Sequence, residues 1–228
     1  MRKKALSIET SSLCNRKCPT CIRNSHPNRE FMQSWFEPNF MPIYMINDIL
    51  KEAKAFKKYR WVISLSYYNE PTMDPRLVEI IKLVRSYGFQ LEFVTNGDFL
   101  SKDLASKLDG LLDVILVSGY ENRKIKKAYF KTLFSKTELR VKNHWHKHTH
   151  FSPNQLPEAK CLTENRLIIN HKGEYLLCCD DFGSFDLGKF PEIGLKDYWY
   201  GDKRTKITKD IAAGNRSKYE YCKSCPRI

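Results

Sequence analysis

The chain has 228 residues, a formal net charge of +13 and 42% hydrophobic residues. These values exclude a disordered polypeptide and allow one sizeable core with a small second domain, since domains usually hold about 100–200 residues. No stretch approaches the ~20 apolar residues of a membrane span, and no signal peptide is visible at the N-terminus. We therefore expect a cytoplasmic protein without a membrane segment, whose eight cysteines are reduced and serve as metal ligands.

Strand and helix patterns alternate over the first 150 residues. The segment 25–42 is polar and rich in proline, and we expect no regular structure there. Ser101 is the expected N-cap of one helix, and Asn47 or Asp48 that of another. The expected strands are 3–10, 61–66, 89–94, 113–118 and 138–145, and the expected helices are 45–59, 77–88, 101–108 and 122–134.

This alternation predicts an α/β fold with a parallel sheet. About five strands and four helices suffice for a partial (β/α) TIM-like barrel, and they are too few for a closed eightfold one. After residue 153 the pattern changes to a β-hairpin over 165–178 and two helices, 195–200 and 203–213. We therefore predict a core domain over residues 1–150 and a small C-terminal domain over residues 151–228.

Three cysteines follow the first strand directly, in a C-x₃-C-x₂-C loop formed by Cys14, Cys18 and Cys21. Soft thiolates select zinc, Cu(I) or iron–sulfur clusters. Three protein ligands leave one coordination position open for chemistry, whereas a structural zinc site or an ordinary [4Fe–4S] cluster takes four. The loop therefore predicts an open metal centre, with a zinc loop of accidental spacing as the alternative.

Polar residues stand at the ends of the next three strands. They are Asn69-Glu70-Pro71, Thr95-Asn96-Gly97 and Ser118-Gly119. In parallel α/β barrels, functional groups collect on the loops after the carboxyl ends of the strands. These residues and the cysteine loop are therefore expected on one rim, as the lining of a cofactor site.

Four further thiols lie in the C-terminal region, at Cys161, Cys178, Cys222 and Cys225. Four cysteines can close a site completely, as in zinc ribbons or [4Fe–4S] clusters. Cys179 is adjacent to Cys178, and the two could exchange roles. Asp180 and Asp181 follow them, either to accept a substrate proton or to cap a loop.

The N-terminal pattern resembles the radical S-adenosylmethionine (radical SAM) enzymes. In that family the three cysteines hold a [4Fe–4S] cluster whose fourth iron binds SAM, which implies that role for Cys14, Cys18 and Cys21. The resemblance also implies SAM contacts for strand-end residues. Glu70 matches the glutamate of the family's Gly-Glu-Pro element, and Asn69 stands at its glycine. Thr95, Asn96 and Ser118 match positions that contact the SAM carboxylate or ribose.

The C-terminal pattern resembles the Twitch domain, the shortened form of the SPASM extension. That domain holds one auxiliary [4Fe–4S] cluster, so the resemblance implies Cys161, Cys178, Cys222 and Cys225 as its ligands, with Cys179 as a spare thiol. Together the two resemblances imply two [4Fe–4S] clusters and bound SAM. The auxiliary cluster is expected to accept an electron from the substrate radical or to be structural.

The activity implied is that of a radical SAM oxidoreductase. A low-potential donor such as flavodoxin or ferredoxin would deliver one electron, SAM would be cleaved to a 5′-deoxyadenosyl radical, and that radical would abstract a substrate hydrogen atom. Aminocyclitol dehydrogenases, which oxidise an alcohol of a sugar-like small molecule, are the most similar members. The alternatives are a peptide-modifying maturase and, in another class, a basic two-zinc nucleic-acid-binding module. Maturases usually carry an N-terminal leader-binding domain, whereas this sequence begins on its first strand.

Basic residues concentrate between positions 122 and 148, where nine lysines and arginines face one acid, Glu138. A positive field attracts anionic partners such as phosphorylated small molecules, nucleic acid or acidic proteins, although a solvated helix face explains it equally well. The same region ends in a histidine tract, His144 to His150, for which a substrate-facing wall, a metal site and a solvated tract remain open.

Overall fold

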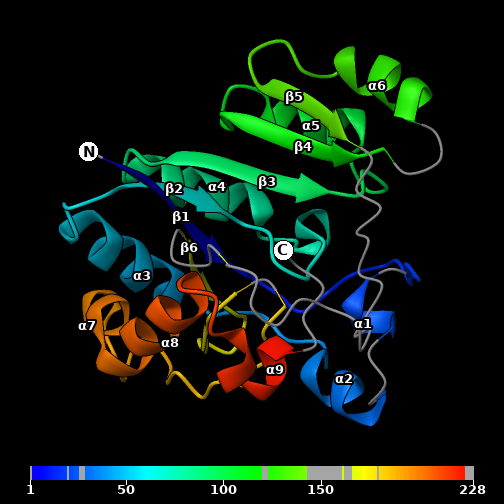
Figure 1. The fold of residues 1–228 in the computed structure, drawn as a ribbon. Coiled ribbons are helices and arrows are strands. Elements are labelled where there is room, and N and C mark those ends of the chain that lie inside the picture. Colours follow the sequence, from blue (N-terminus) through cyan, green and yellow to red (C-terminus); the bar gives the residue numbers. More distant parts are fainter. Residues whose placement is uncertain are drawn as a thin grey trace.

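The computed structural model describes residues 2–19, 21–25, 29–119, 123–142, 161, 166–178 and 180–223. Its strands form one sheet in the order β5-β4-β3-β2-β1-β6-β7 (Figure 1). The first five are β1 (Lys3–Ile8), β2 (Arg60–Ser64), β3 (Gln90–Thr95), β4 (Val114–Ser118) and β5 (Glu138–Lys142), as the sequence predicts within a few residues; β6 (Arg166–Ile169) and β7 (Tyr175–Leu176) follow.

Six of the seven strands are parallel to their neighbours. The hairpin β6–β7 is antiparallel, but β6 also pairs with β1 in parallel, with Ala5 opposite Arg166 and Ile8 opposite Ile169. The predicted α/β partial barrel is therefore confirmed. The sequence predicted the hairpin too, but not that the hairpin extends the sheet on the far side of β1. The predicted division near residue 150 falls outside the described residues and stays a prediction.

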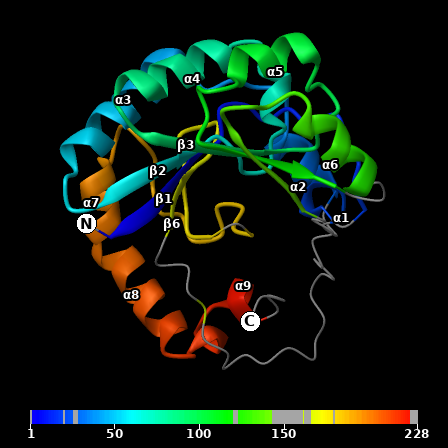
Figure 2. The ribbon, with the colours of Figure 1, turned by 90° about the horizontal axis from the view of Figure 1, so that it is seen from above.

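The two faces of the sheet differ in burial. Along β3, Leu91 and Phe93 are buried, whereas Gln90, Glu92 and Val94 are partly or well exposed on the other face. Figure 2 shows helices α3 (Ile43–Ala55), α4 (Leu77–Ser86) and α5 (Lys102–Leu108) along one side of the curved sheet. The core therefore lies between the sheet and these helices, because alternate side chains of a strand point to opposite faces.

Two expectations about helices are wrong and one is confirmed. The segment expected to be irregular contains helix α2 (Arg29–Trp35), where Met32 and Trp35 bury against Ile168 of β6. Helix α3 begins at Ile43, so the predicted caps Asn47 and Asp48 lie inside it. The predicted cap of α5 is confirmed.

Ser101 caps α5 because its Oγ accepts a hydrogen bond of 3.1 Å from the backbone N of Leu104. This is the ordinary N-cap arrangement, in which a side-chain oxygen satisfies an N–H group of the first turn. The fourth helix of the barrel, α6 (Arg123–Lys131), lies over the β5 edge. Within the described part of the chain, no helix is long and apolar enough to span a bilayer.

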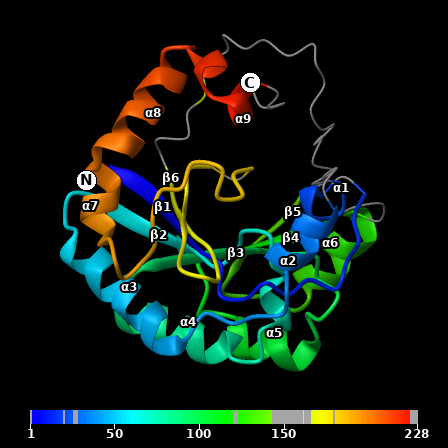
Figure 3. The ribbon, with the colours of Figure 1, turned by 90° about the horizontal axis from the view of Figure 1, so that it is seen from below.

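The C-terminal helices pack on the outside of the barrel. Figure 3 shows α7 (Leu195–Tyr200) beside α3, with α8 (Asp202–Ala212) leading on to α9 (Glu220–Lys223). Trp199 of α7 meets Trp61 of β2 edge to face, with ring centroids 5.4 Å apart, and Tyr198 stacks on Tyr175 of β7 at 4.0 Å. Such aromatic pairs contribute beyond the area they bury. The C-terminal segment therefore shares the core of the barrel.

Candidate cofactor site at the strand-end rim

The cysteine loop connects β1 to the short helix α1 (Ile22–Ser25). Cys14, Cys18 and Cys21 are all partly buried. The backbone N of Cys21 donates to the carbonyl of Cys18 at 3.0 Å, and that of Asn24 donates to Cys21 at 2.8 Å. The second half of the loop is therefore wound into the start of α1, which fixes the backbone at Cys18 and Cys21.

Burial alone disfavours the thiolate form of these residues. It raises the pKa of the Cys21 thiol to about 11 and also raises the pKa of Cys14. Metal ligation requires the thiolate, so the protons would leave when a metal binds. The donor set of three thiols therefore fits an iron–sulfur or zinc centre in chemical type.

The three thiols lie within electrostatic range of one another. Among the residues that the structure describes, no three Cys, His, Asp or Glu side chains surround one point closely enough to hold one metal ion. The charges of Cys14, Cys18 and Cys21 nevertheless act on one another. A [4Fe–4S] cluster takes each thiolate on a different iron, so its ligands do not need to converge on a single centre.

Glu70 is the centre of the strand-end rim. Its carboxylate is buried and accepts hydrogen bonds from the hydroxyl of Thr95 at 2.6 Å and from the backbone N of Asn96 at 2.7 Å. The backbone N and hydroxyl of Thr72 also donate to it, at 3.1 and 2.6 Å. The backbone N of Glu70 itself donates to the carbonyl of Leu13, beside Cys14, at 2.7 Å. One residue therefore joins the ends of β2 and β3 to the cysteine loop.

A second set of hydrogen bonds joins the end of β3 to the same loop. The Asn96 side-chain amide donates to Asn15 Oδ1 at 2.8 Å, and the Asn15 amide donates to Asp98 at 2.9 Å. Arg16 forms an ion pair with Asp98, which lowers the pKa of that carboxyl group. Lys126 of α6 donates to the carbonyl of Asn96 at 2.9 Å. Both residues that follow Cys14 are therefore held by the β3–α5 loop.

The predicted SAM contacts fall into two groups. Glu70, Thr95 and Asn96 lie in one hydrogen-bonded network beside the cysteine loop. Asn69 is buried in its own turn, where it accepts from the backbone N of Tyr67 at 3.0 Å, and Ser118 is buried with its carbonyl 3.4 Å from Lys126. Contact of these five residues with SAM stays a prediction.

The segments that carry the C-terminal cysteines are brought together. The backbone N of Cys161 donates to the carbonyl of Ile211 at the end of α8, and Cys222 lies in α9. Phe185, in the loop after Cys178, contacts the ring of Tyr219 at 5.8 Å, just before α9. Cys179, Cys225 and the histidine tract lie outside the described residues, so the full ligand set is not placed.

Asp181 caps a loop, as one of its two sequence-based interpretations expects. Its carboxylate accepts from the backbone N of Leu177 and of Ser184, both at 2.8 Å. Burial nevertheless raises the pKa of Asp181 to about 6. Tyr67, at the end of β2, donates its hydroxyl to the carbonyl of Asp181 at 2.6 Å. The loop after Cys178 is thereby attached to the rim that Glu70 organises.

A buried Glu–His pair also links the two regions, and sequence reasoning missed it. Glu9, directly after β1, and His171, in the β6–β7 turn, are both almost fully buried, with Glu9 Oε2 2.7 Å from His171 Nδ1. The backbone N of Tyr68 also donates to Glu9, at 3.2 Å. The available sequence signal was Glu9, a charged residue at the end of a predicted strand. No signal in the sequence marked its partner His171, 162 residues away.

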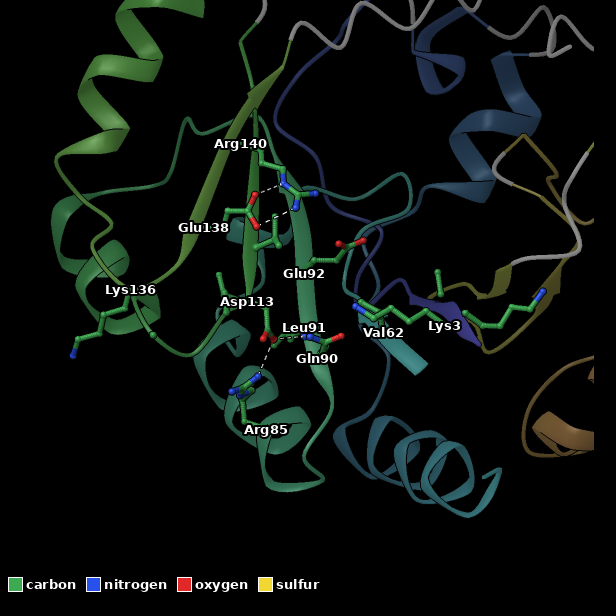
Figure 4. Close-up of a pocket in the computed structure, with 15 residues that line it drawn as sticks. Lys3, Val62, Arg85, Gln90, Leu91, Glu92, Asp113, Lys136, Glu138 and Arg140 are labelled. Atoms are coloured by element: carbon green, nitrogen blue, oxygen red, sulfur yellow. Dashed lines mark hydrogen bonds and ion pairs between the residues drawn. The ribbon is translucent and has the colours of Figure 1, made fainter. Parts of the chain in front are cut away.

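A cavity of about 740 Å³ lies away from this rim, toward the amino-terminal ends of the strands (Figure 4). Two ion pairs line it, Arg85 with Asp113 and Arg140 with Glu138, and Glu92 faces it from β3. None of the predicted cluster or SAM residues is among its lining residues. The cavity is therefore separate from the strand-end site.

Comparison with known proteins gives two family matches. Residues 8–119 match the radical SAM superfamily, and residues 161–226 match the SPASM iron–sulfur cluster-binding domain.

Two curated proteins are similar to part of the chain. One is the tungsten-containing aldehyde ferredoxin oxidoreductase cofactor-modifying protein of Pyrococcus furiosus. It is 30% identical over 117 residues, which is 50% of this chain and 30% of that protein. An S-adenosylmethionine-dependent nucleotide dehydratase of a Thermoplasmatales archaeon is 24% identical over 115 residues, 50% of this chain and 37% of that protein. The chain thus spans well under half the length of these relatives.

Solved structures show the same fold over the whole chain. BtrN in complex with AdoMet and 2-DOIA has a TM-score of 0.80 at 22% identity, covering 100% of this chain and 94% of BtrN. The enzyme anSMEcpe with bound AdoMet has a TM-score of 0.67 at 13% identity, covering 99% and 85%. The cysteine loop and the strand-end rim lie in the first matched region, and the C-terminal cysteines lie in the second. The chain belongs to the radical SAM superfamily, with a radical SAM domain followed by a SPASM iron–sulfur cluster-binding domain.

Proposed function

We propose that this chain is a radical SAM enzyme in which Cys14, Cys18 and Cys21 hold a SAM-binding [4Fe–4S] cluster. When bound, the cluster and SAM supply a one-electron cleavage that gives methionine and a 5′-deoxyadenosyl radical, which takes a hydrogen atom from the substrate. The observation that carries the proposal is the contact of the Glu70 network with the cysteine loop. Because these groups come from three separate segments, a chance zinc loop does not explain their convergence.

The strand-end residues have two parts in this proposal. Asn96 and Glu70 present polar groups at the rim and are the direct candidates for contact with SAM, together with Thr95. Asn69 and Ser118 support the rim, since their polar atoms face the neighbouring backbone and Lys126. All these groups are held before any ligand arrives, and preorganised donors cost little reorganisation on binding.

We further propose that Cys161, Cys178, Cys222 and Cys225 hold a second [4Fe–4S] cluster, with Cys179 able to replace Cys178. The shared sheet and the bonds from Tyr67 support an auxiliary domain, residues 151–228, that is fixed against the core, residues 1–150. A substrate would lie between the two clusters. The auxiliary cluster would take up the second electron of a two-electron oxidation.

The substrate we propose is a hydroxylated small molecule whose alcohol is oxidised. The fold likeness to BtrN with 2-DOIA over nearly the whole of both chains supports this choice. The basic surface favours an anionic or phosphorylated form of such a substrate. A peptide substrate is the second candidate, because anSMEcpe with AdoMet and a peptide shares the fold at a TM-score of 0.66.

The test is anaerobic reconstitution with iron and sulfide, followed by reduction in the presence of SAM. Wild-type protein should bind about eight irons, as two [4Fe–4S] clusters require, and release 5′-deoxyadenosine. Cys14→Ala should abolish the release, whereas Cys225→Ala should retain part of it. Zinc-loaded, colourless protein that leaves SAM intact would refute the proposal.

The oxidation itself is tested with candidate substrates deuterated at the carbinol carbon. Transfer of deuterium into 5′-deoxyadenosine together with a ketone product identifies alcohol dehydrogenation. Deuterium transfer from a peptide, with none from cyclitols or sugars, would assign the chain to peptide modification instead.

A further inference from the structure

Helix α6 presents an exposed basic face. It has no acidic residue among its nine, Arg123–Lys131, and Lys124, Lys127 and Lys131 are all exposed. Within the described part of the chain, none of these three lysines has an ion pair. Residues three and four apart lie on the same side of a helix, so the three ammonium groups form one stripe.

Two exposed apolar side chains lie on the opposite flank of the same helix. Ile125 is 71% exposed and Tyr129 45%, and their spacing of four residues makes them neighbours on the helix. Phe130 is buried against the barrel, so α6 has its own inward face and does not need these two residues for packing. Large apolar side chains within a charged surface are typical of protein docking sites, where tyrosine is enriched.

Part of the charge is placed against the helix dipole. The amino end of a helix carries a partial positive charge, so basic residues in its first turn are unfavourable. Lys124 occupies that turn, whereas Lys131 in the last turn is favourably placed. An acidic partner would offset this repulsion, which a merely solvated helix face would leave uncompensated.

Helix α6 is connected to the cysteine loop through the end of β3. Lys126 donates to the carbonyls of Asn96 and Ser118, at 2.9 and 3.4 Å. The Asn96 amide in turn donates to Asn15, the residue next to Cys14. Two contacts, Lys126 with Asn96 and Asn96 with Asn15, would therefore connect α6 and a protein bound on it to the cysteine loop.

We propose that the outer face of α6 is the docking surface for an acidic, low-potential electron-transfer protein. The docked carrier would be oxidised by one electron, and that electron would reduce the cluster held by Cys14, Cys18 and Cys21. The inference rests on the proposed function, which requires one reducing electron for each SAM cleaved. Charge complementarity would increase the association rate and make binding sensitive to salt.

The test compares two triple variants of the reconstituted enzyme with an acidic flavodoxin as the probe. Lys124→Glu/Lys127→Glu/Lys131→Glu changes the α6 stripe, and Lys51→Glu/Lys82→Glu/Lys209→Glu makes the same charge change at exposed helix lysines elsewhere. Calorimetry at low salt should show at least tenfold weaker flavodoxin binding for the α6 variant than for the control. Flavodoxin-driven SAM cleavage should fall in parallel, while dithionite-driven cleavage stays at the wild-type level.

Equal flavodoxin affinity of the two variants, or no binding by the wild type, would overturn the docking surface. Loss of dithionite-driven cleavage in the α6 variant alone would also overturn it, since α6 would then be needed by the site itself. Binding of poly(U) RNA that only the α6 variant loses, with flavodoxin binding unchanged, would assign the face to nucleic acid. Failure of all SAM cleavage in the wild type would instead refute the proposed function and leave the calorimetry to decide the docking.

Discussion

At the residue scale, Glu70 organises the strand-end rim because its carboxylate oxygens accept several hydrogen bonds. Its buried carboxylate accepts hydrogen bonds from both Thr95 and Asn96, so the last residue of β3 and the one after it cannot move independently of the end of β2. Hydrogen bonds to an ionised group contribute about 1.5–3 kcal/mol each, more than neutral ones. Donors from two segments, Thr72 and Thr95-Asn96, thus hold the Glu70 carboxylate in place before a cofactor binds.

Gly97, the last residue of the Thr95-Asn96-Gly97 tripeptide, has no room for a side chain. Its φ of +81° is unfavourable for other residues, and a Cβ there would lie 2.8 Å from the Phe130 ring. We predict that Gly97→Ala lowers the free energy of unfolding by roughly 2–4 kcal/mol, the sum of backbone strain and overpacking. SAM cleavage should fall too, because the Gly97 backbone N donates to Thr95.

The matched control for this variant is Gly88→Ala. Gly88 has a similar φ of +76°, but its nearest neighbour would be the flexible Lys54 ammonium at 3.7 Å. Gly88→Ala should therefore lower the free energy of unfolding, measured with urea, by the backbone strain alone, about 1–2 kcal/mol. SAM cleavage by this variant should be normal. Equal losses in the two variants would show that Phe130 does not constrain the rim.

Asp109 gives a pH-dependent contribution to stability. Burial opposes its ionised form, but hydrogen bonds from Ser135, Lys136 and Thr137 outweigh that effect and hold its pKa well below the usual range. A lowered folded-state pKa stabilises the fold above the unfolded value of about 4, and the benefit is lost as the pH falls through the folded value.

We therefore predict that Asp109→Asn destabilises the protein at pH 7 and that its deficit against the wild type narrows between pH 4 and pH 2. Urea unfolding across this range measures the deficit. Asp103→Asn, which removes only an exposed pair with Lys107, should differ little from the wild type at any pH. A deficit for Asp109→Asn that is constant with pH would show that its charge is not involved.

At the element scale, the β6–β7 hairpin is attached to the barrel by its pairing with β1 and by the Glu9–His171 contact. Removing the carboxylate of Glu9 would deprive three groups of this partner: the ring and the backbone N of buried His171, and the partly buried backbone N of Tyr68. Each such donor costs about 1–3 kcal/mol. Glu9→Ala should therefore lower the free energy of unfolding by about 3 kcal/mol or more and expose the hairpin to proteolysis.

An exposed glutamate on helix α4 provides the comparison. Glu79→Ala should stay within about 0.5 kcal/mol of the wild type. Combined with His171→Ala, the Glu9→Ala variant should lose less than the sum of the single variants, because contacting residues are not additive. Additive losses would mean that the two side chains act independently.

The elements were largely predictable because local patterns determine them. The strands show alternating or continuous apolar runs, and Ser101 is a plain cap signal, so β1 to β5 and α5 followed from the sequence. Helix α2 did not, since its apolar residues are few and are buried against the β6–β7 hairpin and Phe182, which are far away in the chain. The start of α3 was predicted too far along the chain. The residue before the helix is Pro42, so no polar capping residue marks the true start.

At the scale of the whole molecule, the main unexpected feature is the continuity of the sheet. The sequence predicts a hairpin near the C-terminus, but parallel pairing of β6 with β1 depends on contacts across more than 150 residues. The same holds for the site, where spacing and strand-end position predict the cysteines, Glu70, Thr95 and Asn96. Spacing could not show that Asn15 and Lys126 contact Asn96, or that Arg16 pairs with Asp98, because no local pattern encodes these contacts.

The structure also shows where part of the positive charge lies. A net charge of +13 gives no partner by itself. The structure places part of it on the exposed face of α6, which Asn96 connects to the cysteine loop, whereas Arg85 and Arg140 are paired with acids in the cavity at the opposite edge of the sheet. This exposed face of α6 is the docking surface that we propose for an electron carrier.

The most direct test of the central claim is the electron paramagnetic resonance spectrum of the reduced, reconstituted protein with and without SAM. If Cys14, Cys18 and Cys21 hold a cluster with an open iron, SAM should change the wild-type spectrum. The Cys14→Ala/Cys18→Ala/Cys21→Ala variant should keep only an auxiliary-cluster signal that does not respond to SAM. A SAM response that persists in this variant, or a wild-type spectrum that ignores SAM, would contradict the account.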